Sequence, residues 1–74
     1  MYKVSIATIS ARTGEILTLN QSNYKTYIDA IRILSGLISY YHNISKQVEL
    51  FNNNYAIIKL NSSIVKSISI DEIK

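Results

Sequence analysis

The chain has no cysteine and no proline, and only two of its 74 residues are glycine. Without thiolates it can form neither a disulfide framework nor the zinc and iron–sulfur sites that depend on cysteine. It also has no long uninterrupted apolar run, so a transmembrane helix of about 20 residues is excluded. The N-terminus lacks the apolar region of a secretory signal peptide. We therefore expect a cytoplasmic protein.

Groups that could support catalysis are few and scattered. The carboxylates are Glu15, Asp29, Glu49, Asp71 and Glu72. The only adjacent pair lies near the C-terminus, where we expect a frayed, solvated tail. The only histidine, His42, is expected at a helix C-terminus, where an imidazolium interacts favourably with the helix dipole. Because an active site needs several such groups together, we expect no catalytic site, no metal and no cofactor.

What is present is a high apolar content in a short chain. Hydrophobic residues make up 47% of the sequence, and the size allows a single domain over residues 1–74. A domain this small buries only about 60–65% of its unfolded surface, so its core is thin. Small domains compensate with disulfides, metals or association. Because this chain has neither cysteines nor a set of metal ligands, we expect association to stabilise it. The expected form is a homo-oligomer, most simply a dimer.

Hydrophobic periodicity predicts five strands and one helix. Alternating residues indicate strands over residues 2–9, 15–20, 46–51, 55–60 and 64–70. The side chains expected to face the core in the first two strands are Tyr2, Val4, Ile6, Leu17 and Leu19. Turns are predicted at Gly14, which is free to take a positive φ, and at residues 52–54, since asparagine favours turns.

The helix is predicted over residues 23–42, with Ser22 or Asn23 as its N-cap and Asn43 as a left-handed end. Its inward face is expected to comprise Tyr24, Tyr27, Ile28, Ile31, Leu34, Ile38 and Tyr41. The element order β-β-α-β-β-(β) predicts an α+β fold class, a small two-layer domain with an antiparallel sheet and one helix packed on one face.

The helix is apolar over too wide an arc. Ile33, Leu37 and Tyr40 extend its apolar face to roughly 220°, whereas packing on one sheet needs only about 100°. One interpretation is a second contact surface for another subunit or protein. In the other, the sheet curls around the helix or the C-terminal segment packs there. Gly36 fits the first interpretation, because a close approach of another backbone would explain a glycine inside a helix.

The excess of lysine and arginine over aspartate and glutamate allows nucleic acid as an alternative partner. The formal net charge is +3 and the six tyrosines offer stacking surfaces. Lys25 and Arg32 are expected to share the polar stripe of the helix. The eight cations are nevertheless spread almost evenly along the chain and form no cluster. An ordinary solvated face, with Lys25 pairing with Asp29, accounts for the same pattern.

We therefore favour the hypothesis of a non-enzymatic protein–protein interaction module, a homodimer that associates through Ile33, Leu37, Tyr40 and Gly36. Isoleucine, asparagine, lysine and tyrosine have AT-rich codons, which suits low-GC bacteria and their phages. In a phage or mobile element, such a module would bind and modulate a host protein. The alternative is a small nucleic-acid-binding domain that uses scattered lysines, arginines and tyrosines, either on an exposed sheet face or at Lys25 and Arg32. An enzyme ranks third.

Overall fold

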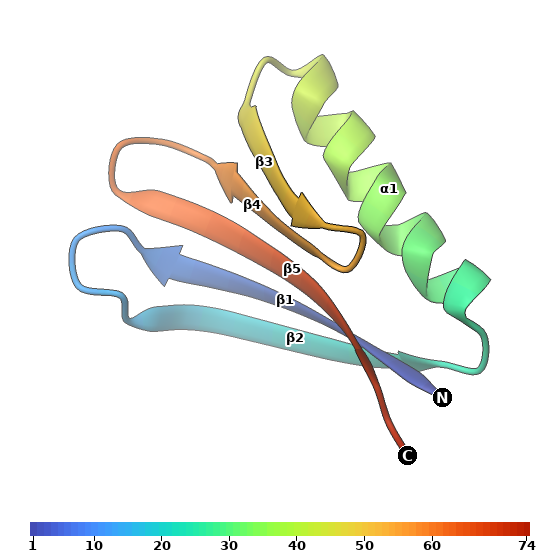
Figure 1. The fold of residues 1–74 in the computed structure, drawn as a ribbon. Helices are drawn as coiled ribbons and strands as arrows, with labels where there is room; N and C mark the ends of the chain where they lie inside the picture. Colours follow the sequence, from blue (N-terminus) through green and yellow to red (C-terminus); the bar gives the residue numbers. More distant parts are fainter.

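The computed structural model describes all residues from Met1 to Lys74 and consists of five strands and one helix (Figure 1). In chain order these are β1 (Tyr2–Ser10), β2 (Ile16–Tyr24), α1 (Tyr27–Asn43), β3 (Gln47–Asn52), β4 (Tyr55–Lys59) and β5 (Ile64–Glu72). The predicted α+β class, with one helix on an antiparallel sheet, is confirmed. No helix of the chain is both long and apolar enough to cross a membrane.

The strands form one antiparallel sheet in the order β2-β1-β5-β4-β3. The first and last strands, β1 and β5, pair over nine residues beside each other in the sheet. Helix α1 connects the two edge strands, leading from β2 to β3, and covers one face of the sheet (Figure 1). The opposite face carries no helix. The sheet therefore has one covered face, one open face and two free edges.

The core lies between α1 and the three inner strands. Its cluster of buried residues comprises Val4, Ala30, Leu34, Ala56, Ile58, Ile68 and Ile70. Strand residues enter it at alternate positions, as the pleat requires. Val4 is buried and Tyr2 and Ile6 pack against the cluster, which confirms the inward face predicted for the first strand. Only eight of the 74 residues are buried, so the core is thin.

The prediction for the second strand is wrong about its inward face. Leu17 and Leu19 do not face the core; Leu19 is 52% exposed, and β2 continues to Tyr24. The register pairs Leu19 with Ala7, which alternation places on the sheet face opposite Val4. Alternation identifies the two faces of a strand, but the position of α1 decides which of them is covered.

The helix begins later than predicted. Thr26, rather than Ser22 or Asn23, is the N-cap, and its side-chain oxygen accepts a hydrogen bond from the Asp29 backbone N–H at 3.2 Å. Ser22 and Asn23 instead pair with β1, so Tyr24 ends a strand although it still packs against the core. The polar residues before the helix have the polarity of a capping loop, but they belong to an edge strand whose side chains face solvent.

Two further helix predictions are wrong. Ile28 was placed on the inward face but is 61% exposed, because it lies about 100° round the helix from Tyr27 and beyond the edge of the core. The left-handed residue after the helix is Ser45, with φ 64°, and not Asn43, which is still helical. The predicted turn glycine is confirmed, since Gly14 has φ 76°.

The C-terminal segment is a strand and not a frayed tail. Asp71 and Glu72 belong to β5 and pair with Lys3 and Tyr2 of β1. The backbone N–H of Ile73 donates to the carbonyl oxygen of Met1 at 2.8 Å. The prediction failed because the partner strand lies at the opposite end of the chain, where local polarity carries no information about pairing.

Candidate functional site

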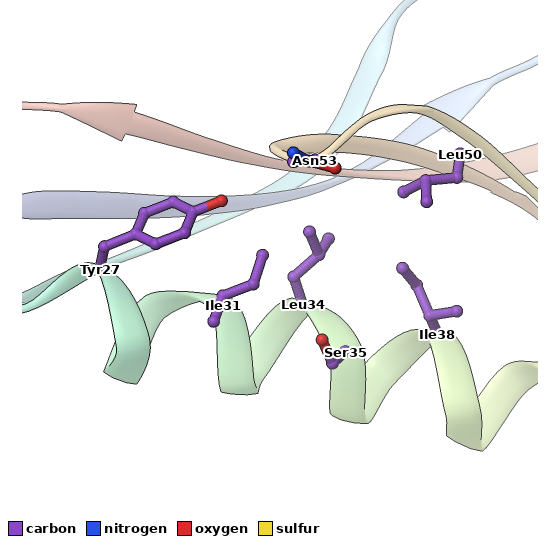
Figure 2. A pocket seen from close by; sticks show the side chains of 7 residues that line it. All are labelled: Tyr27, Ile31, Leu34, Ser35, Ile38, Leu50 and Asn53. Atoms are coloured by element: carbon purple, nitrogen blue, oxygen red, sulfur yellow. The ribbon is translucent and has the colours of Figure 1, made fainter.

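An apolar groove runs between α1 and the β3–β4 hairpin (Figure 2). It has a volume of about 370 Å³, and five of its seven lining residues are hydrophobic. The lining residues are Tyr27, Ile31, Leu34, Ser35, Ile38, Leu50 and Asn53. We call this the α1–β3 groove.

The helical side of the groove follows from residue spacing. Tyr27, Ile31, Leu34 and Ile38 recur every three or four residues, which aligns them along one side of a helix. In Figure 2 these side chains point from α1 towards the strands, with Leu50 facing Ile38 and Leu34 from the other side. Leu34 forms the buried floor, while Tyr27, Ile31 and Ile38 are partly buried.

The sheet side of the groove is the edge strand β3. Leu50 pairs with Ala56, a buried core residue, so the register places Leu50 on the face that α1 covers. It is nevertheless 58% exposed, because no further strand lies beyond β3 to enclose it. The apolar side chain of Leu50 is thus exposed to solvent at the mouth of the α1–β3 groove.

One end of the groove is tied by hydrogen bonds. The Tyr27 hydroxyl donates to Oδ1 of Asn54, and the Asn54 backbone N–H donates to Oδ1 of Asn52 at 2.7 Å. The Tyr27 ring also contacts the edge of Tyr2, with 5.5 Å between centroids. The bond from Tyr27 to Asn54 ties the β3–β4 turn to the start of α1, at one end of the groove.

The chemistry of the groove is that of apolar binding. Its polar lining is limited to Ser35, Asn53 and the Tyr27 hydroxyl, with no carboxylate, imidazole or ammonium group. Nowhere does the chain bring together three residues of the kinds that ligate metals. The arrangement can hold apolar side chains and offer a few hydrogen bonds.

The residues proposed from sequence as a helix interface lie on the other flank of α1. Ile33 and Leu37 are partly buried and pack against the core, so the sheet accounts for part of the wide apolar arc. Gly36 and Tyr40 are exposed, and the Tyr40 ring meets Tyr41 edge-on at 5.1 Å. Association through this flank of α1 stays a prediction. The flank leaves less apolar surface uncovered than the sequence indicated.

Replacing Gly36 with alanine is expected to stabilise the isolated domain by about 1 kcal/mol, the difference in helix propensity. An added Cβ would meet no atom within 4 Å, so there is no opposing clash. Urea unfolding at low protein concentration measures the effect. A loss of stability would contradict the prediction. A gain at low concentration that disappears at high concentration would show a second chain packed against Gly36.

The two residues proposed for nucleic acid are not on one helical stripe. Lys25 precedes the N-cap Thr26, so it cannot form the expected helical pair with Asp29, whereas Arg32 is on α1 and exposed. Other cations are engaged within the domain. The Lys46 ammonium donates to the Leu60 carbonyl at 3.0 Å, and that of Lys66 donates to the Tyr41 hydroxyl at 2.9 Å.

Sequence reasoning missed the groove although it found most of its helical lining. Ile31, Leu34 and Ile38 were assigned to the core, and Leu50 was treated as an ordinary strand residue. Only the strand order shows that Leu50 stands on an edge.

A scan of family models, a search of curated proteins and a search of solved structures each found no match for this chain.

Proposed function

We propose that this protein is a small, non-catalytic protein–protein interaction module that binds an extended apolar segment of a partner in the α1–β3 groove. The observation that carries the proposal is the groove itself, about 370 Å³ and largely apolar, beside a free strand edge. Sites of this volume that are lined by hydrophobic side chains and a few polar groups are typical binding sites.

The neighbouring edge strand supports an extended ligand. β3 lies at the end of the sheet, so alternate backbone N–H and C=O groups along it have no partner strand. A peptide that adds to such an edge gains main-chain hydrogen bonds, and alternate side chains enter pockets on one face. Here the face that α1 covers is the one carrying Leu50, so every second side chain of the peptide would enter the groove.

The overall charge of the molecule favours a segment with acidic residues beside its apolar ones. The net charge of +3 steers acidic partners towards the molecule. Nucleic acid is less well supported, because the Lys46 and Lys66 ammonium groups donate hydrogen bonds within the domain.

Replacing Leu50 with aspartate is expected to weaken binding of such a segment by at least about tenfold, since a carboxylate would be desolvated at the mouth of the groove. The probes are peptides enriched from a random library displayed on phage, and isothermal titration measures their affinity. Leu50 is exposed, so the fold should survive. Chemical-shift changes in the wild-type protein should map to residues 27–38 and 47–53.

The matched control is Leu19→Asp, which places the same charge at an equally exposed leucine on the other edge strand. It should leave peptide affinity unchanged. A library that yields no binding peptide, or peptides that lose affinity equally with both variants, would overturn the proposal.

A further inference from the structure

The other edge of the sheet is unusually unprotected. β2 is a nine-residue edge strand in which every residue except Tyr24 is exposed. It contains no charged residue and no proline, the two devices with which natural proteins usually prevent edge strands from pairing with other chains. Its single irregularity is a register shift near one end, where Leu17 has no direct partner on β1.

The β2 edge strand also carries exposed apolar side chains. Ile16, Leu17 and Leu19 are all about half exposed, and the register places Leu19 on the open face of the sheet, opposite Ala7. The total accessible surface, 5063 Å², is about 10% larger than the roughly 4,600 Å² expected for a folded monomer of 8.4 kDa. The molecule thus leaves more surface uncovered than its mass predicts.

The charges that flank β2 are complementary to those of a second copy. Glu15 immediately precedes the strand and Lys25 immediately follows it, each five positions from Asn20 at its centre. In an antiparallel pair of β2 strands related by a two-fold axis at Asn20, residues 18–22 of one copy lie directly opposite residues 22–18 of the other. The irregularity at Leu17 shifts the pairing beyond Thr18, so Glu15 of each copy lies at the same end of the interface as Lys25 of the other without facing it directly. The two copies therefore attract at both ends of the interface.

We infer that two copies of this chain associate through antiparallel β2–β2 pairing centred on Asn20, joining their five-stranded sheets into one continuous sheet. Thr18 of one copy then lies opposite Ser22 of the other, a pair that can hydrogen bond. The two Leu19 side chains become diagonal neighbours across the axis, within reach of each other on the open face. Such closed two-fold contacts are the commonest in soluble oligomers.

Pairing through the other edge is less favourable. β3 has only six residues, and its Glu49 lies at the centre of the strand. Antiparallel self-pairing of β3 would bring two glutamates close together across the axis, and like charges on neighbouring strands are destabilising. The inference rests on the proposed function, an interaction module, but names the partner and uses the edge opposite the α1–β3 groove, so either can fail alone.

The absence of native cysteine makes cross-linking a direct test. Residues directly opposite in an antiparallel pair have Cα atoms about 4.5–5.5 Å apart, which is within disulfide range. Asn20→Cys should therefore form a covalent dimer under mild oxidation about tenfold faster than Gln47→Cys on the β3 edge. Gly36→Cys on the helix flank, which would report a helix-mediated dimer, should be as slow as Gln47→Cys.

Charge reversal tests the antiparallel arrangement of the two β2 strands. In sedimentation equilibrium, Glu15→Lys should weaken the dimer several-fold by placing two lysines together at each end, and Glu15→Lys with Lys25→Glu should restore it. Leu50→Asp should leave dimerisation unchanged, which separates this result from peptide binding in the groove. A wild type that stays monomeric at several hundred micromolar, fastest cross-linking at Gly36→Cys, or no rescue by the double variant would overturn the inference.

Discussion

Replacing Leu34 with alanine is expected to lower the free energy of unfolding by about 3 kcal/mol, within the range of about 2–5 kcal/mol for deleting a buried leucine side chain. Leu34 is only 2% exposed and belongs to the core cluster. A 74-residue domain has a total stability of about 4–11 kcal/mol, so one substitution removes a large share of it. Urea denaturation at fixed protein concentration, followed by circular dichroism, measures the loss.

The control for this substitution is Leu50→Ala, which deletes the same atoms from a leucine that is 58% exposed. It should cost less than about 0.5 kcal/mol, as exposed substitutions usually do. Equal losses at the two positions would contradict the packing described for α1, because they would mean that Leu34 is no better enclosed than Leu50.

The second large effect is expected from Ala30→Leu. Ala30 has no exposed surface and lies in the core cluster with Ala56, another fully buried alanine. These small side chains allow α1 to approach the sheet closely, and a leucine there would have to displace packed neighbours. Overpacking of this kind typically costs about 1–3 kcal/mol, and we expect a value at the upper end because the site has no spare volume.

Ser39→Leu provides the comparison for Ala30→Leu, since Ser39 is an exposed position of the same helix. Leucine is a better helix former than serine, so this substitution should be neutral or slightly stabilising. Ala30→Leu should also shift the NMR signals of core residues such as Ile58 and Ile68, which Ser39→Leu should leave in place. A stable Ala30→Leu variant with unchanged core signals would show that α1 lies farther from the sheet.

The two proposed binding surfaces, the α1–β3 groove and the β2 edge, lie at opposite edges of the sheet. Because the helix connects the two edges of the sheet, it leaves both β2 and β3 free of a neighbouring strand. β3 runs beside the helix and shares a groove with it, which suits a ligand that inserts side chains. β2 has no charged residue and carries Leu19 on the open face, which suits pairing with the edge strand of a second sheet. The geometry therefore allows a dimer that presents two peptide grooves.

Much of the fold was predictable because it depends on local patterns. Alternation over Tyr2, Val4 and Ile6 located the first strand, and the three-to-four-residue spacing of Ile31 and Leu34 located the body of the helix. Local patterns could not show that Asp71 pairs with Lys3, since 68 positions separate them in the chain. They also misplaced the helix start, because solvent-facing residues of an edge strand have the polarity of a loop.

The sequence by itself determined the fold class, the thinness of the core and the absence of cysteine-based sites. These follow from composition and from periodicities that every helix and strand must obey. Only the tertiary structure decided which leucines are exposed. Leu19 and Leu50 lie in strands of similar pattern to those of the core, yet both stand on sheet edges. Strand order arises from pairing between distant segments, and it alone creates the groove and the free edge on which the proposed interactions depend.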